Sequence, residues 1–287
     1  MIRIITDSAA DMEKAELEKY SVTSVPLSVS FGENTYLDGV NLEKDRFYEL
    51  LETEEEFPKT SQPSPDTFLK EFESAKEAGD EVIVILISGS LSGTFQSANI
   101  ARQMAEYDSI YIVDSLNATG GEKALIFHAA SLRDKGYTAK EIAAELEKLK
   151  TRLRLVAGLD TLEYLCKGGR LSKTAAGIGT LANIKPIIKL TPEGTVGLAE
   201  KCMGRKSTMN KLVKHLDKTG VDSSFPLYML YSYDKGNCDE FADKLKEKGY
   251  NLDNAVFTNV GPTIGAHVGK GAFGIVYFIP EESKLPA

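Results

Sequence analysis

Cysteine is scarce in this sequence, and the three that occur, Cys166, Cys202 and Cys238, lie far apart. Isolated cysteines suggest neither a zinc site nor a disulfide framework, so we expect reduced thiols with structural roles. Long apolar runs are missing as well, because no segment approaches the roughly 18 continuous apolar residues of a membrane span. We therefore expect no stable insertion into a membrane.

The first residues, MIRIITDSAAD, lack the basic region, the long apolar stretch and the small-residue cleavage site of a secretory signal. We accordingly expect a cytoplasmic location. Basic residues are in the minority, with 34 Lys and Arg against 42 Asp and Glu and a net charge of -8. Binding to a phosphate backbone needs a basic face, so nucleic acid is not expected as a partner.

What the sequence does contain is a regular alternation of strand and helix patterns. The first half holds four apolar, β-branched runs, IRIIT, VTSVPLSVSF, EVIVILI and SIYIV, and helical or mixed segments follow them. Such alternation predicts β-α units around a mostly parallel sheet. The almost wholly apolar EVIVILI suits a central strand that is covered on both faces.

The second half changes its rhythm. A helix over TAKEIAAELEKLKTRL, with Ile142, Leu146 and Leu149 on one face, is expected to bridge the two halves. After it, KPIIKLTPEGTVGLAEKC predicts an antiparallel hairpin, so the second sheet is expected to be mixed. A chain of 287 residues is long for one core. We therefore predict an α/β protein with an N-terminal domain over 1–152, a C-terminal domain over 153–287 and a cleft between them.

One short stretch is unusually rich in hydroxyl groups. Residues 87–94, ISGSLSGT, follow the third predicted strand, and a helix is expected to begin near Thr94. The free amides and the dipole at a helix start favour an anion, and hydroxyl groups add further donors. A single hydroxyl that caps the helix is the structural alternative. Capping accounts for one hydroxyl but not for four, so the pattern favours an anion-binding site.

The same stretch differs from a hydrolase nucleophile elbow, because Leu91 stands where the nucleophile belongs. The chain has three histidines. His128 and His215 lie in long helical patterns, which favours surface or packing roles. His267 lies among five glycines between two predicted strands, where the glycines indicate tight turns or close backbone contact. A structural role and a functional role for His267 both stay open.

Nucleotide binding is not supported by any motif. Gly269, Gly271 and Gly274 have the spacing of a dinucleotide fingerprint, but they lead into a strand instead of following one and opening a helix. No phosphate-binding G-x-x-x-x-G-K-[ST] loop occurs. No pair of carboxylates stands at a spacing suited to a metal or to acid-base catalysis. We expect no metal and no cofactor.

Several polar positions leave two interpretations open. Asp7 and Asp114 follow predicted strands, where they line a cleft or cap a turn. Arg170 and Arg205 face an anion or lie on the surface. The proline-containing segment 60–65, TSQPSP, is a solvated loop or is held rigidly over a site.

Six motifs taken together resemble the DegV family. They are TDSAAD near the start, TSQPSP at 60–65, SGSLSGTFQSA at 88–98, VDS at 113–115, GGRLS at 168–172 and GPTIGAHVGKGAFG at 261–274. One of these alone is weak evidence, but all six occur in the right order. The resemblance covers essentially the whole chain.

This resemblance implies two α/β domains with a long-chain fatty acid buried between or beneath them. In the family, the carboxylate is held by the threonine that opens the TSQPS motif and by the serine of the LSGT motif. These positions are Thr60 and Ser92 here, and Arg170 and His267 correspond to residues near the head group. Further neighbours of the head group are expected at Ser61, Gly93 and Thr94. Ser88 and Ser90 are left with turn or supporting roles.

The function implied is that of a carrier without a catalytic site of its own. It would bind a long-chain fatty acid such as palmitate in a buried apolar tunnel and present the carboxylate to a separate fatty acid kinase catalytic subunit. The acyl phosphate would then pass to an acyltransferase. Burying about fourteen methylenes at roughly 0.8 kcal/mol each offers on the order of 11 kcal/mol, minus the cost of immobilising the ligand.

Two other functions stay open at this point. A lipid hydrolase or acyltransferase would use Ser92 as nucleophile with His267 as base. A small-anion sensor would bind short carboxylates or phosphate as tightly as long chains.

Overall fold

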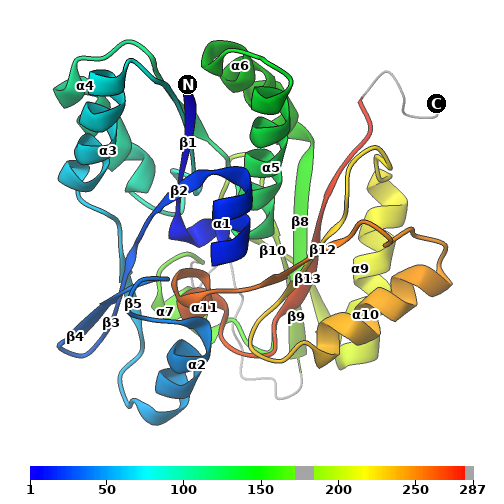
Figure 1. Cartoon of the computed structure of the whole chain (residues 1–287). Coiled ribbons are helices and arrows are strands. Elements are labelled where there is room, and N and C mark those ends of the chain that lie inside the picture. The colour runs from blue at the N-terminus through cyan, green and yellow to red at the C-terminus, as the bar shows by residue number, and fades with distance from the viewer. Residues whose placement is uncertain (172–183, 282–287) are drawn as a thin grey trace.

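The computed structural model describes residues 1–171 and 184–281 of the chain. Ser172, the last residue of the GGRLS motif, lies outside these ranges. The strands form three sheets, with helices packed around and between them (Figure 1). The predicted α/β class is confirmed.

The first sheet is fully parallel and has the order β2-β1-β6-β7. Its strands are β1 (Ile2–Asp7), β2 (Val22–Val25), β6 (Glu81–Leu86) and β7 (Ile110–Asp114), and α1 (Lys14–Tyr20) connects the first two. One face packs on α3 (Pro65–Ala78) and α4 (Thr94–Ala105), and the other packs on α5 (Gly120–Asp134) and α6 (Ala139–Leu149). β6 lies between β1 and β7 with Val82 to Leu86 buried, as predicted for a central strand.

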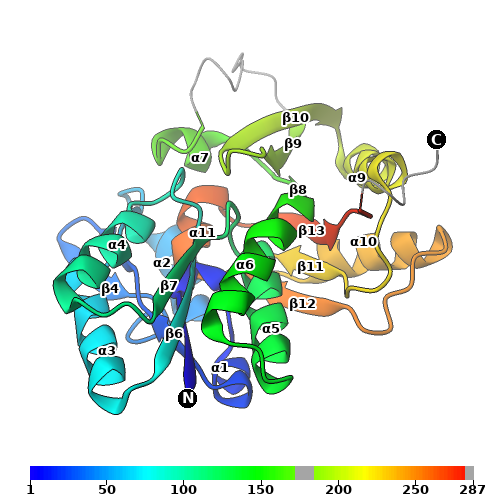
Figure 2. The same cartoon turned by 90° about the horizontal axis from the view of Figure 1, so that it is seen from above.

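The second sheet has six strands in the order β10-β9-β8-β13-β11-β12 and is mixed, as predicted. Its members are β8 (Leu153–Gly158), β9 (Ile184–Leu190), β10 (Val196–Met203), β11 (Tyr228–Tyr231), β12 (Val256–Asn259) and β13 (Phe273–Phe278). β9 and β10 form the predicted antiparallel hairpin at one edge (Figure 2). α9 (Arg205–Thr219) and α10 (Gly236–Glu247) cover one face.

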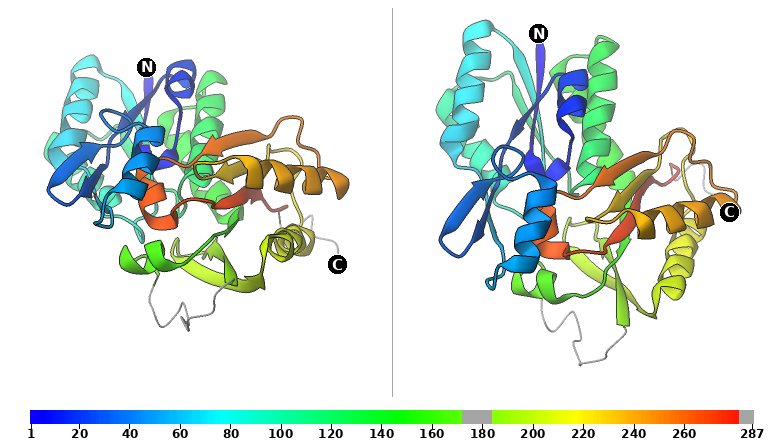
Figure 3. Two further views of the ribbon diagram at one scale, coloured as in Figure 1. Left: turned by 90° about the horizontal axis from the view of Figure 1, so that it is seen from below. Right: turned by 60° about the horizontal axis from the view of Figure 1, so that its bottom comes forward.

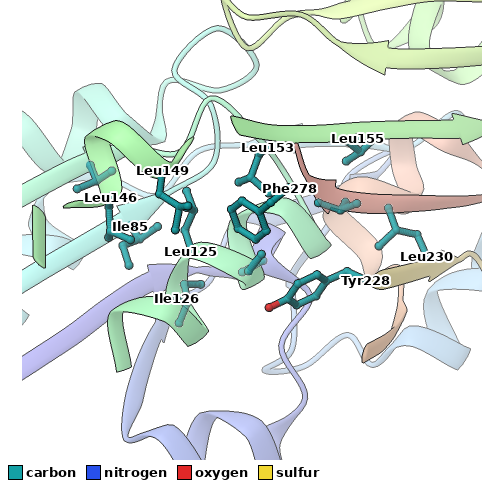
Figure 4. Packing of buried hydrophobic residues seen from close by; sticks show 14 of the residues in the cluster. Ile85, Leu125, Ile126, Leu146, Leu149, Leu153, Leu155, Tyr228, Leu230 and Phe278 are labelled. Carbon is teal, nitrogen blue, oxygen red and sulfur yellow. The ribbon is translucent and has the colours of Figure 1, made fainter. Parts of the chain in front are cut away.

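Helix α5 joins the two large sheets into one core. Leu125 and Ile126 of α5 share one buried cluster with Ile85 of the parallel sheet and with Tyr228 and Phe278 of the six-stranded sheet (Figure 4). The chain passes into the second sheet through η2 (Lys150–Arg152), directly before β8. The division at 152 and 153 stays a prediction.

A third, smaller sheet differs from the sequence prediction. The apolar run 22–31 is not one strand, because β2 ends at Val25 and Pro26 intervenes before β3 (Ser28–Phe31). Proline has no amide hydrogen for a strand ladder, and here the chain leaves the parallel sheet at Pro26. β3 instead pairs antiparallel with β4 (Asn34–Leu37) and β5 (Lys59–Ser61). This sheet lies beside α2 (Lys44–Thr53) and α11 (Pro262–Val268) (Figure 3).

Within 1–171 and 184–281, no helix combines the length and the hydrophobicity needed to cross a bilayer.

Candidate functional site

A largely apolar cavity lies between the loops of the parallel sheet and one face of the six-stranded sheet. Its apolar lining includes Leu155, Ala157, Ile188, Leu190, Leu230 and Phe273. The space free of atoms between its walls, mouth included, is about 820 Å³. The volume that the centre of a water-sized sphere can occupy is about 90 Å³, against roughly 10–15 Å³ for one water, so the cavity has room for a ligand larger than a single water molecule.

The predicted site residues Thr60, Ser92, Arg170 and His267 all line this cavity. They come from four segments that are far apart in the sequence: β5, the loop between β6 and α4, the segment after α7 (Glu163–Lys167), and α11. The structure brings these four side chains to one place. Whether they bind a carboxylate stays a prediction.

Thr60 is held in β5 and not in a loop. It pairs with Val29 of β3, so the start of the TSQPSP segment is held rigidly in a sheet and is not a solvated loop. Side chains alternate along a strand, so Thr60 faces the cavity while Ser61 is exposed and does not line it. The Oγ1 atom of Thr60 lies 2.9 Å from Nε2 of His267.

Ser92 precedes the first residue of α4 by two positions. Its hydroxyl lies 2.8 Å from the Thr94 hydroxyl and accepts a hydrogen bond from the Thr94 amide. Helix α4 begins at Thr94, as predicted, with Gly93 as its N-cap. Ser92 therefore stands beside a helix N-terminus, where the amides and the dipole favour an anion. Gly93 and Thr94 do not line the cavity themselves.

His267 lies on the short helix α11, although the glycines around it predict turns. Two buried aspartates from the N-terminal region hold the start of this helix. Asp38 accepts hydrogen bonds from the amide and the hydroxyl of Thr263, and Asp11 accepts one from the Gly261 amide. These distant contacts satisfy the free amides of the first turn, which the local sequence does not reveal.

The imidazole of His267 is largely enclosed. A Cβ on Gly168 would lie only 2.2 Å from its Nδ1 atom, so the end of α7 packs directly on the ring. Burial, and secondly the charge of Arg170, lower the pKa of His267 from 6.5 to about 4. The ring is therefore neutral at neutral pH. Nδ1 is buried and has no hydrogen-bond partner within the described part of the chain.

Arg170 connects two walls of the cavity. Its Nε atom donates to the Leu91 carbonyl at 3.0 Å, and Nη1 donates to the Gly168 carbonyl at 2.7 Å. Both acceptors are uncharged, so these bonds leave the positive charge available to an anion in the cavity. Burial lowers the pKa of Arg170, although a guanidinium stays protonated at any ordinary pH.

The His267 ring is expected not to titrate between pH 5 and 8, because its folded-state pKa is about 4. Because this pKa lies below the ordinary 6.5, the buried neutral ring contributes fully to the free energy of unfolding above pH 6.5. That contribution falls as the pH drops toward 4. NMR of the His267 ring protons over pH 3.5–8 would measure the midpoint. A midpoint near 6.5 would contradict the burial argument, and a His267→Gln variant identifies the resonance.

The other polar candidates have structural partners. Asp7 accepts hydrogen bonds from the amides of Ala9 and Ile87, and burial raises its pKa to about 7. Asp114 accepts from the amides of Gly89 and Leu116. Neither aspartate lines the cavity, so the capping interpretation is confirmed for both. Arg205 begins α9, is exposed and does not line the cavity.

The remaining hydroxyls of ISGSLSGT contact the hairpin of β9 and β10. Ser88, fully buried, donates to the Gly194 carbonyl at 2.9 Å, and Ser90 donates to the Glu193 carbonyl at 2.7 Å. The two serines thus hold the hairpin tip against the loop of the parallel sheet. Sequence reasoning did not find these contacts, because the partners lie more than 100 positions away and are main-chain atoms.

Two further threonines of the lining, Thr119 and Thr263, were also not predicted. Thr263 had one available signal, because it is the threonine of the GPT that begins the last motif.

A metal site is a separate question. Within the two described ranges, no group of three or more His, Cys, Asp or Glu side chains is arranged to hold a metal ion.

The chain is similar to known proteins over nearly its whole length. A model of the family described as "Uncharacterised protein, DegV family" matches residues 1–280. A DegV domain-containing protein of Caldanaerobacter subterraneus subsp. tengcongensis is 32% identical over 279 residues, which cover 96% of this chain and 98% of that protein.

Solved structures are similar over nearly the whole chain. One, described as showing fatty acid binding of a DegV family protein from Thermus thermophilus, is 29% identical with a TM-score of 0.88 and covers 97% of this chain and 99% of its own. Another is the fatty acid kinase B3 protein of Streptococcus pneumoniae, loaded with linoleic acid. It is 25% identical with a TM-score of 0.86 and covers 98% of this chain and 100% of its own.

Proposed function

The chain belongs to the DegV family, and on this premise we propose that it binds a long-chain fatty acid in the cavity, with the carboxylate at Thr60 and Ser92. One observation carries the proposal. An apolar cavity has Thr60, Ser92, Arg170 and His267 in its lining. That combination suits a ligand with one anionic end and a long apolar remainder. Relatives that are named for bound fatty acids support the same ligand class.

The chemistry of the head-group end fits a carboxylate. A hydroxyl can accept one hydrogen bond and donate another, so Thr60 can accept from the neutral His267 ring and donate to the ligand. Ser92 would donate from the start of α4, where the helix dipole also favours the negative charge. Arg170 adds a positive charge beside the Ser92 loop, since its Nε atom donates to the Leu91 carbonyl. The carboxylate would thus be satisfied by several groups and not by one ion pair.

The tail would lie on the apolar face of the six-stranded sheet. Affinity from burying methylenes far exceeds what the head group supplies, at roughly 0.8 kcal/mol for each methylene. The head group would then orient the ligand and the tail would hold it. In the proposed division into domains 1–152 and 153–287, the parallel sheet belongs to the first domain and the six-stranded sheet to the second. The fatty acid would then lie between the two domains.

We further propose that the bound acid is presented to a separate fatty acid kinase subunit and that an acyltransferase uses the acyl phosphate. Similarity to the Streptococcus pneumoniae fatty acid kinase B3 protein supports the kinase step. The Arg170 guanidinium and the N-terminus of α4 would also favour the extra negative charge of an acyl phosphate.

Protein purified from cells is expected to carry bound fatty acid, seen by native mass spectrometry and by lipid extraction. Delipidated protein is expected to bind palmitate far more tightly than acetate or inorganic phosphate, because the tail supplies most of the affinity. Absence of both bound lipid and palmitate binding would overturn the proposal. Equal affinity for acetate and palmitate would favour a small-anion sensor instead.

The hydrolase alternative has no support from the geometry. Nε2 of His267 pairs with Thr60, and the Ser92 hydroxyl pairs with Thr94, so the nucleophile and the base are not coupled to each other. A histidine with a pKa of about 4 is also a weak base at neutral pH. We expect no turnover of p-nitrophenyl palmitate, and sustained turnover that is lost in Ser92→Ala would reverse this conclusion.

A further inference from the structure

Gln62, in the middle of the TSQPSP segment, is two residues from Thr60 and contacts the segment that carries Ser92. It follows β5, which carries Thr60, and its side chain reaches α4, the helix that begins just after Ser92. The side chain itself is exposed and does not line the cavity. It therefore has no direct role in holding the ligand and little role in a hydrophobic core.

The backbone of the segment determines where Gln62 points. Gln62 precedes Pro63, and a residue before proline is restricted to an extended conformation. Side chains two positions apart in an extended chain lie on the same side. Gln62 is thus directed to the same side as Thr60, while Ser61 between them points away and is exposed.

The contacts of the Gln62 carboxamide are with the first turn of α4. Its Nε2 atom donates to the Ser97 hydroxyl at 2.9 Å, and Ser97 is 1% exposed. Its Oε1 atom lies only 1.8 Å from the position that a Cβ on Gly93 would occupy. The amide therefore rests directly on the backbone of Gly93, next to Ser92. An added Cβ at Gly93 would therefore displace the end of the Gln62 side chain without straining the backbone, since the φ of -73° is accessible to any residue.

We infer that Gln62 is a positioning residue that holds the Ser92 loop at a set distance from Thr60, so that both hydroxyls reach the same carboxylate. This inference rests on the proposed function. Thr60 belongs to the small sheet and Ser92 to a loop of the parallel sheet. Gln62, two residues from Thr60, links the two segments: its amide lies against Gly93, next to Ser92, and donates to Ser97 of the same helix start. A shift of one segment relative to the other would change the distance between the Thr60 and Ser92 hydroxyl groups, and one carboxylate could then no longer accept from both.

A comparison of two ligands tests the role. Gln62→Ala is expected to weaken palmitate binding by about tenfold, the size of one lost hydrogen bond to a charged group. It is expected to change the binding of hexadecanol, which has the same tail and no carboxylate, by less than about twofold. Isothermal titration of delipidated protein with both ligands measures the two ratios. Gln62→Met keeps the length of the side chain but not the hydrogen bond to Ser97, and the same pattern is expected.

Gly93→Ala provides an independent test. The added methyl group would displace the Gln62 amide, so this variant is expected to lose a similar share of palmitate affinity. In a Gln62→Ala background the same change is expected to cost little more, because the clashing group is gone. Gln103→Ala, at the far end of α4, is the matched control and is expected to bind both ligands like the unchanged protein.

The inference and the proposed function fail in different ways. If the unchanged protein binds no palmitate, the proposed function is wrong. If it binds palmitate but Gln62→Ala and Gln62→Met bind it equally well, the inference is wrong. Equal losses for palmitate and hexadecanol, or fully additive losses for Gln62→Ala and Gly93→Ala, would also overturn it. Circular dichroism melts confirm that each variant compared is folded.

Discussion

Ser92→Ala is expected to weaken palmitate binding by roughly 10- to 100-fold, the value of a hydrogen bond to a charged group at 1.5–3 kcal/mol. The loss is large because the carboxylate would be removed from water in an apolar cavity and would keep an unsatisfied oxygen. Thr60→Val, which keeps the shape of the side chain, is expected to have an effect of the same order. Isothermal titration or displacement of a fluorescent fatty acid measures both.

The matched control for these variants is Ser30→Ala. Ser30 lies on β3, its hydroxyl is 2.8 Å from the Thr35 hydroxyl, and it does not line the cavity. Its removal should leave palmitate affinity unchanged. If Ser92→Ala and Thr60→Val both bound palmitate like the Ser30→Ala control, the proposed carboxylate position would be wrong, even if the protein still bound the lipid.

Gly194→Ala is expected to lower the free energy of unfolding by about 2–4 kcal/mol, from the left-handed backbone and from lost hydrogen bonds to the hairpin tip. Gly194 has a φ of 74°, and an added Cβ would lie 2.1 Å from the Ser88 hydroxyl and 3.1 Å from Cα of Leu116. The hairpin tip would have to leave the loop that carries Ser88 and Ser90. Urea unfolding followed by circular dichroism measures the change.

Gly39→Ala separates the two causes of this effect. Gly39 has nearly the same φ, 73°, but an added Cβ there has no atom within 4 Å. This variant reports the backbone cost alone, about 1–2 kcal/mol. The excess loss in Gly194→Ala then measures the contact with Ser88. If the two variants lost equal stability, the packing of the hairpin tip on Ser88 would contribute nothing. Ser88→Ala is expected to lose two hydrogen bonds, the one donated to the Gly194 carbonyl and the one accepted from the Ser90 amide, at about 1–3 kcal/mol together.

Much of the secondary structure could be predicted because its signals are local. The apolar run of β6, the buried face of α6 with Ile142, Leu146 and Leu149, and the β9–β10 hairpin all follow from periodicity and turn residues. The start of α4 at Thr94 follows from the glycine and hydroxyl residues before it. Each of these patterns depends on neighbours within a few positions in the chain.

Other elements depend on contacts between distant residues. The helix α11, which carries His267, forms where glycines predict turns, because Asp11 and Asp38 satisfy its first amides. The separation of β2 from β3 at Pro26 had a local signal, and so did β4, which follows β3 through a two-residue turn at Gly32 and Glu33. β5, which pairs with the other edge of β3, lies far along the chain and had none. Asp11 and Asp38 lie more than 200 positions from α11 and do not affect its local helix propensity, so this helix is decided only in the folded chain.

By itself, the sequence determined the α/β class, most strand and helix positions, and, through resemblance, the residues Thr60, Ser92, Arg170 and His267. Only the tertiary structure decided that these four side chains line one apolar cavity and that Thr60 bonds to His267. It also decided what the other hydroxyls of ISGSLSGT do, since Ser88 and Ser90 hold the hairpin tip. The physical reason is that periodicity and capping act along the chain, whereas a cavity and its hydrogen bonds form between surfaces that meet only after folding.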